Sequence, residues 1–141
     1  MAEMSKIDKL YIERRANEWV KKVKTLYSFV KFALTSYKEI EYKSTNNVVM
    51  YEELMEKFGV LPKNVPIFDL YVDKQLIATF KPIGLWVLGS KGRIDILTKS
   101  GAFILVDVAK NQSEWKVYPP ENRKKGESFD KKFIDKLVSS Q

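Results

Sequence analysis

A single apolar stripe runs through the first quarter of the chain and constrains its fold more than any other feature. The stripe positions recur in alternating steps of four and three residues, which is the spacing of one face of an α-helix. They are Ile12, Ala16, Trp19, Val23, Leu26, Val30, Ala33 and Tyr37, and Val20, Tyr27 and Leu34 widen the stripe. The spacing predicts one helix from Asp8 to Tyr37, with Ser5 placed to cap its first turn.

The composition of the stripe indicates what the helix packs against. Its Trp, Tyr, Ala and Val residues make it wider and less regular than a zipper of Leu and Ile. We therefore expect the helix to lie across a β-sheet. A helix of this length can also pair with a second copy of itself, so a self-associating structural protein, a homodimer through the first helix, stands as an alternative.

Short elements follow the helix. The stretch SYKEIEYKSTNNVVMY alternates as one edge strand, and YEELMEKFGVLP reads as a short helix that Gly59 and Pro62 terminate. In IFDLYVDKQLIATFKP the period becomes two, which predicts a hairpin with its turn at 73–75. The inward residues of this hairpin are expected to be Phe68, Leu70, Val72, Leu76, Ala78 and Phe80.

The remainder of the chain predicts more strands and a closing helix. Turn residues in GSKG and KSG separate further strands, and SEWKVYPP supplies a last short strand that its two prolines end. Ser128 precedes a helical pattern and is predicted to cap it. The side of this helix predicted to be buried carries Phe129, Phe133, Leu137 and Val138.

The order of these elements defines the fold class. Helix, strand, helix, consecutive strands and helix indicate an α+β fold, in a single domain of residues 1–141. We expect the long amino-terminal helix to pack on one curved antiparallel sheet, a meander of about five to six strands. In element order the chain resembles the NTF2-like proteins, in which a long amino-terminal helix precedes antiparallel strands that end in a WKV type strand. The resemblance implies a cone-shaped sheet with helices packed inside.

The chain contains neither cysteine nor histidine. This excludes disulfides, thiolate nucleophiles, zinc sites of the Cys/His type and an imidazole general base. Catalysis would have to use carboxylates, a metal ion or a lysine base. We therefore expect a binding or accessory domain without catalytic machinery or a cofactor.

The amino terminus carries no targeting signal of the secretory kind. MAEMSKIDKLYIERR lacks an uninterrupted apolar core. The longest uncharged run, near Ile83 to Gly89, is shorter than the roughly 20 residues of a membrane span. The sequence predicts a cytoplasmic protein without a membrane partner, and the missing cysteines are compatible with that location.

Positive charge gathers at the two ends of the chain. Of the net charge of +7, residues 1–38 supply +5 (nine Lys/Arg against four Asp/Glu) and residues 111–141 supply +2 (seven against five). This asymmetry indicates a positive surface that attracts an acidic macromolecule, either nucleic acid or protein. Aromatic residues among the cations can stack on bases. The predicted binding residues are Arg14, Arg15, Lys21, Lys22, Phe29, Phe32, Arg123, Lys124 and Lys125.

One pair of strands favours a different function. RIDIL and LVDVAK resemble the catalytic hairpin of the PD-(D/E)XK nucleases, with Asp95 and Asp107 in the acid positions. The resemblance implies a divergent magnesium-dependent nuclease in which both aspartates hold Mg²⁺ and Lys110 positions the attacking water. The lysine of that family stands two residues after the second acid, where this chain has Ala109. Lys110 is one residue late and on the opposite face of the strand.

Strand register distinguishes the two interpretations of this hairpin. A three-residue KSG turn, with Gly101 in the left-handed conformation, places Arg93 opposite Asp107 as an ion pair. A shifted register places Asp95 opposite Asp107, where two carboxylates need a cation between them. We expect the first register, and hence a structural role for both aspartates.

Overall fold

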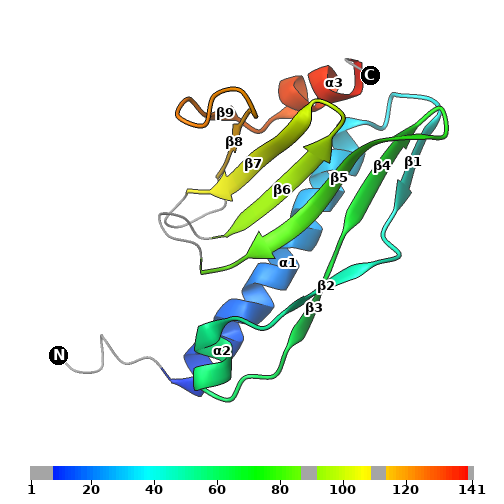
Figure 1. The fold of residues 1–141 in the computed structure, drawn as a ribbon. Coiled ribbons are helices and arrows are strands. Elements are labelled where there is room, and N and C mark those ends of the chain that lie inside the picture. Colours follow the sequence, from blue (N-terminus) through cyan, green and yellow to red (C-terminus); the bar gives the residue numbers. More distant parts are fainter. Residues whose placement is uncertain (1–7, 87–91, 109–113, 140–141) are drawn as a thin grey trace.

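The computed structural model describes residues 8–86, 92–108 and 114–139 (Figure 1). In this described part the helices are α1 (Lys9–Ala33), α2 (Glu53–Lys57) and α3 (Lys131–Ser139). The strands are β1 (Ile40–Lys43), β2 (Asn47–Met50), β3 (Lys63–Pro66), β4 (Phe68–Val72), β5 (Gln75–Gly84), β6 (Arg93–Thr98), β7 (Gly101–Asp107), β8 (Trp115–Tyr118) and β9 (Glu127–Ser128). The α+β class and the long amino-terminal helix predicted from the sequence are confirmed, but the helix ends at Ala33 and not at the predicted Tyr37.

Seven strands form one antiparallel sheet in the order β1-β4-β5-β6-β7-β8-β9, where a meander of about five to six was expected. α1 crosses one face of this sheet, and α3 packs on the same side beside the end of α1 (Figure 1). β2 and β3 form a separate two-stranded ribbon that runs along the amino-terminal half of α1. We call the face toward α1 the inner face and the opposite one the outer face.

The single edge strand predicted for residues 36–51 is two strands in different sheets. β1 pairs with β4, whereas β2 pairs with β3. Two hydrogen bonds join the segment between β1 and β2 to Ile67, where the chain passes from β3 to β4. The Ile67 amide donates to the Asn46 carbonyl at 2.9 Å, and the Ser44 hydroxyl donates to the Ile67 carbonyl at 2.8 Å. The prediction was wrong because alternation reports the faces of a strand and not its partner.

α1 begins at Lys9 because Asp8 caps it, accepting a hydrogen bond from the Tyr11 amide at 2.9 Å. Ser5, the predicted cap, lies outside the described residues. The positions of the stripe from Ile12 to Ala33 that recur in steps of four and three are no more than 5% exposed, while Val20 at its flank is partly buried. The sheet covers this stripe within the chain, and the homodimer through the first helix stays a prediction.

Gly59 ends α2 as the sequence predicted. It has a φ of 72°, and the next amide, that of Val60, donates back to the Met55 carbonyl at 2.8 Å. Val60 is then buried against the core. This is the reversal by which a glycine in the left-handed region closes a helix.

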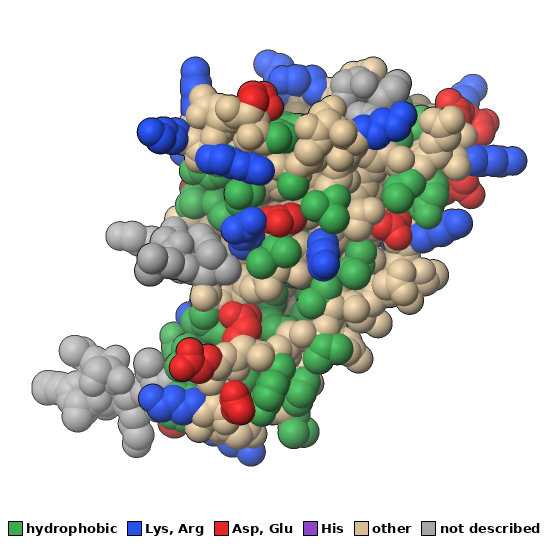
Figure 2. Space-filling view, in the orientation of Figure 1, with side chains coloured by type: hydrophobic (Ala, Val, Ile, Leu, Met, Phe, Trp, Pro, Cys, Tyr) green, Lys and Arg blue, Asp and Glu red, His purple; other side chains and the backbone are tan. Residues whose placement is uncertain are grey.

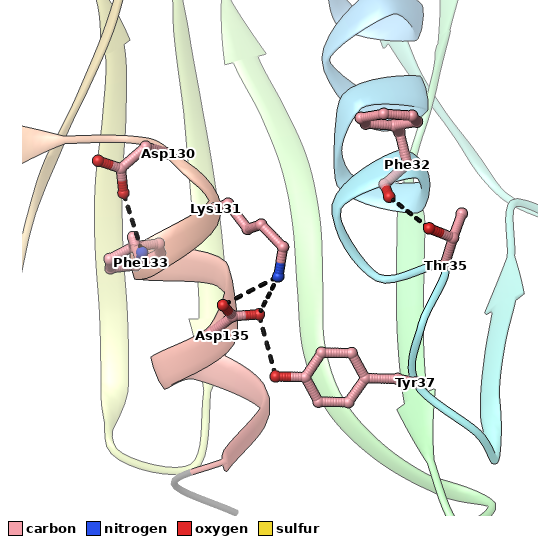
Figure 3. Close-up of polar contacts among 7 residues, drawn as sticks. All are labelled: Phe32, Thr35, Tyr37, Asp130, Lys131, Phe133 and Asp135. Carbon is pink, nitrogen blue, oxygen red and sulfur yellow. Dashed lines mark hydrogen bonds and ion pairs between the residues drawn. The ribbon is translucent and has the colours of Figure 1, made fainter.

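α3 has a different cap from the one predicted (Figure 3). Asp130 accepts the Phe133 amide at 3.0 Å, whereas Ser128 belongs to β9. Asp130 takes this role because α3 starts at Lys131. The buried side of the helix is confirmed: the side chains that face the core are Phe129, Phe133, Ile134, Leu137 and Val138.

Figure 3 also shows how α3 is tied to the segment that follows α1. The Tyr37 hydroxyl donates to Asp135 Oδ1 at 3.0 Å, and the Lys131 ammonium lies 3.0 Å from Asp135 Oδ2. The hydrogen bonds from Lys131 and then from Tyr37 lower the pKa of the Asp135 carboxyl. The hydrogen bond that Tyr37 donates to Asp135 raises the pKa of the Tyr37 hydroxyl.

The β4–β5 hairpin departs from the predicted pattern in two ways, because its turn is shorter than the predicted 73–75 and Leu76 lies on the other face. Asp73 and Lys74, with φ of 50° and 67°, make a two-residue turn, and the register shifts between Leu70 and Tyr71. This bulge moves Leu76 to the outer face, where it is half exposed, while Ile77 and Ala78 are buried. The prediction that Leu76 points inward was wrong because a bulge reverses the alternation locally.

Aromatic side chains fill the space between α1 and the sheet. The ring of Tyr27 stacks on Phe68 with centroids 4.7 Å apart, and its hydroxyl donates to the Pro66 carbonyl at 2.7 Å. Burial, with the nearby Asp69 carboxylate, raises the pKa of Tyr27. Trp19 is buried and packs against Trp115, with ring centroids 6.1 Å apart. Among the described helices, none is long and apolar enough to cross a membrane.

Candidate functional site

The β6–β7 hairpin has a tighter turn than the sequence predicted. Thr98 lies opposite Gly101, so the turn contains only Lys99 and Ser100. The Thr98 side chain closes it: its Oγ1 accepts the Ser100 amide at 3.1 Å, and its hydroxyl donates to the Gly101 carbonyl at 2.9 Å. The predicted three-residue turn was wrong, and the two hydrogen bonds of the Thr98 side chain stabilise the two-residue turn that forms instead.

This difference of one residue moves every cross-strand pair of the hairpin. Arg93 lies opposite Val106 and Asp95 opposite Ile104, in place of the predicted pairs with Asp107 and Leu105. A slip of one residue exchanges the faces of one strand relative to the other. Asp95 therefore lies on the outer face and Asp107 on the inner face, where its neighbour in the same row, Leu105, is fully buried.

Asp95 finds its cation on its own strand. Arg93, two residues earlier on the same face, donates from Nε to Asp95 Oδ1 at 2.8 Å and from Nη2 to Oδ2 at 3.2 Å. A guanidinium that meets a carboxylate with two parallel hydrogen bonds is a specific geometry. The sequence predicted that Arg93 pairs with Asp107, whereas in the structure it pairs with Asp95.

Asp107 is the only charged residue that is buried in the described part of the chain, with 1% of its surface exposed. Its Oδ2 lies 2.6 Å from the Lys22 ammonium, which reaches it from α1, and its Oδ1 accepts the Glu114 amide at 3.0 Å. Asp107 thus joins the end of β7 to both α1 and the start of β8. Both carboxylate oxygens therefore make contacts that hold separate parts of the fold together.

These positions do not form the metal site that the nuclease resemblance implied. Asp95 and Asp107 lie on opposite faces of the sheet, and each carboxylate is already engaged by a cation. Within the described ranges no group of three or more acidic residues is placed to hold a metal ion. Lys110, the third predicted member, lies outside the described residues.

The predicted cations of α1 divide into two sets. Arg14 and Lys21 are exposed on the side of the helix away from the sheet. Lys22 is held by Asp107, and Arg15 donates to the Tyr11 hydroxyl at 3.1 Å and lies 4.0 Å from Glu18. Lys24, which the sequence analysis did not single out, is exposed and falls on the same outward side as Arg14 and Lys21 by helical spacing.

Phe29 and Phe32, the two aromatic residues predicted to contact a partner, differ in how they pack and how exposed they are. Phe29 packs against Phe129 of the core with centroids 6.2 Å apart. Phe32 is 75% exposed and lies on the last turn of α1 (Figure 3). Phe29 is 38% exposed, so Phe32 is the more accessible of the two rings for a stacking contact with a partner.

The basic residues near the carboxy terminus occupy a separate position. Arg123, Lys124 and Lys125 are exposed in the loop between β8 and β9. Arg123 donates to the Tyr118 carbonyl at 3.3 Å, which fixes the start of the loop. Figure 1 shows this loop beyond β8 at the edge of the sheet, while the amino-terminal half of α1 lies toward the opposite end. The structure therefore divides the predicted positive face into two surfaces.

Comparison of the chain with protein-family models, with curated proteins and with solved structures found no match. The interpretation of its surfaces therefore rests on their own geometry and charge.

Proposed function

We propose that the protein is a small binding module that docks an acidic macromolecule, nucleic acid or protein, in the cytoplasm. The principal contact is the outward row of α1 formed by Arg14, Lys21 and Lys24, which we call the α1 basic row. The loop cations Arg123, Lys124 and Lys125 form a second contact. Phe32 supplies an aromatic surface at the carboxy-terminal end of α1.

The observation that carries this proposal is the difference between neighbouring lysines. Lys22 forms an ion pair with Asp107. Arg14, Lys21 and Lys24 make no ion pair with any residue of the described part. Lys24 lies ten residues after Arg14, so the row extends about 15 Å along the helix at 1.5 Å per residue. Unpaired cations on a rigid element favour binding of an extended anion more than they favour stability.

Nucleic acid is the first probe for this proposal. A labelled single strand and a labelled duplex are titrated with the protein at several salt concentrations, and binding is followed by fluorescence anisotropy. Contacts to phosphates release counterions, so affinity should fall steeply between about 50 and 200 mM salt. Poly-L-glutamate serves as a second probe, since it presents an acidic polymer without bases.

Charge reversal locates the contact. Arg14→Glu with Lys21→Glu should weaken binding by about tenfold or more through lost phosphate contacts. Lys99→Glu with Lys132→Glu makes the same change in net charge at exposed positions elsewhere, and should weaken binding much less. Equal losses in both variants would show that only net charge matters. Failure to bind nucleic acid with retained binding of poly-L-glutamate would favour a protein partner, and failure with both probes would overturn the proposal.

A further inference from the structure

A small slot opens where the β2–β3 ribbon leaves the main sheet. β4 accompanies β5 only as far as Phe80, so the segment from Lys81 to Gly84 has no β4 partner. The ribbon diverges at this point and crosses in front of α1 below the end of β5 (Figure 1). A cavity of about 190 Å³ lies between them.

The slot is lined by apolar side chains and, in similar measure, by polar groups. Met50 and Val65 from the ribbon and Pro82 from β5 are buried around it, and the indole of Trp19 lines it from α1. The rim carries Val49, Tyr51 and Ile83, which are 64%, 48% and 45% exposed. Large apolar side chains exposed around a hollow are typical of a binding site.

One charged side chain is part of the lining. The Glu52 carboxylate, which also lines the slot, accepts the Leu85 amide at 2.7 Å and the Trp86 amide at 3.1 Å. The carboxylate lies close to Gly84, where a Cβ would meet Glu52 Oε1 at 3.4 Å, an ordinary contact distance. An ionised carboxylate has about four acceptor positions, so two backbone donors leave it capacity for further donors.

In the part of the chain that the structure describes, no side chain compensates the charge of Glu52. No ion pair joins it to a cation within the described residues. The stretch from Asn47 to Phe58 holds three glutamates and one lysine, and Figure 2 shows acidic side chains gathered over α2 at the lower end of the molecule. A partly buried carboxylate without a cation favours a positively charged ligand.

We propose that this slot binds a small organic cation, a primary ammonium group attached to a compact apolar body. The ammonium donates to the free acceptor positions of Glu52, and the apolar body lies between the ribbon and Pro82 against the indole of Trp19. An anion of the same shape is repelled by Glu52. This site is separate from the α1 basic row and does not depend on the proposed function.

The test uses the full chain and three probes of similar shape. 2-Phenylethylammonium, the neutral 2-phenylethanol and the anion phenylacetate are each titrated while amide and indole signals are followed by NMR. The cation should cause saturable shifts at Gly84, Leu85 and Trp86 and at the Trp19 indole. 2-Phenylethanol should bind about tenfold or more weakly, because it lacks the charge-assisted hydrogen bond. Phenylacetate should not bind in the slot.

Two variants make the assignment specific. Glu52→Gln keeps the size of the side chain and should weaken binding of the cation about tenfold or more. Val49→Trp leaves Glu52 intact and should block the slot from its exposed rim, whereas Leu61→Trp makes a similar change at an exposed position outside the lining. If Glu52→Gln disturbs the fold, the comparison of Val49→Trp with Leu61→Trp decides. Equal binding of cation and anion, shifts confined to other residues, or undiminished binding by Val49→Trp would overturn the proposal.

Discussion

The inner and outer faces of the β6–β7 hairpin each carry one aspartate, and the two have opposite relations to the fold. Asp107 is buried and depends on a lysine that is 85 residues away in the sequence. Asp95 is more exposed and is paired by Arg93, two residues away. The same residue type thus fixes tertiary structure on one face and makes a local surface contact on the other. Burial, which decides how much a lost partner costs, accounts for the difference.

The largest expected effect comes from removing the lysine of the buried pair. Lys22→Met should lower the free energy of unfolding by about 3 kcal/mol, because the Asp107 carboxylate stays buried without its ammonium partner. Urea denaturation measures this change. Lys21→Met, one residue earlier on the exposed side, should change the same quantity by less than about 0.5 kcal/mol. Equal effects of the two substitutions would contradict the role assigned to the ion pair.

A second substitution should recover part of that loss. In Lys22→Met with Asp107→Asn the buried charge is absent, while the amide oxygen of asparagine can still accept the Glu114 amide. The double variant should therefore be more stable than Lys22→Met alone by about 1 to 2 kcal/mol, since burial of a neutral amide costs less than burial of an unpaired charge. The same denaturation experiment measures it. A double variant that is less stable than either single variant would show that Lys22 stabilises the fold in another way.

The outer aspartate should matter less. Asp95→Asn removes the charge that Arg93 meets, but the arginine is about one third exposed and can turn to water. We expect a loss of about 0.5 to 1 kcal/mol in the free energy of unfolding, as for a partly screened pair. Urea denaturation of Asp95→Asn and Lys22→Met under the same conditions tests whether the first variant loses less stability than the second. A loss as large as that of Lys22→Met would remove the contrast between the two faces.

The smallest expected effect is the response of the α3 tether to pH. Because Lys131 and Tyr37 lower the pKa of Asp135 in the folded protein, the contribution of this contact is complete above the ordinary aspartate pKa. It is lost as the pH falls through the lowered value. A carbon NMR titration of the Asp135 carboxyl should show a pKa below that of an unperturbed aspartate. Tyr37→Phe should move the pKa back toward the ordinary value, and an unchanged titration would contradict the contact.

Much of the fold could be predicted because it follows from local periodicity. The stripe of α1, the buried side of α3 and the reversal at Gly59 each depend on residues within a few turns of one another. The candidate site was less predictable. Arg14 and Lys21 lie on the exposed side as expected, but the assignment of Lys22 as a free cation was wrong. Its position on the flank of the stripe, beside the inner row that ends in Asp107, is the signal that could have identified it.

The sequence by itself determined the elements of this protein, since backbone geometry converts spacing into helix faces and strand faces without reference to distant residues. Only the tertiary structure decided which elements became neighbours and in which register. A turn shorter by one residue at Lys99 and Ser100 placed Asp95 and Asp107 on opposite faces, and the docking of α1 brought Lys22 to Asp107. The energy of such pairs depends on distance and burial across the chain, and spacing along the sequence contains neither quantity.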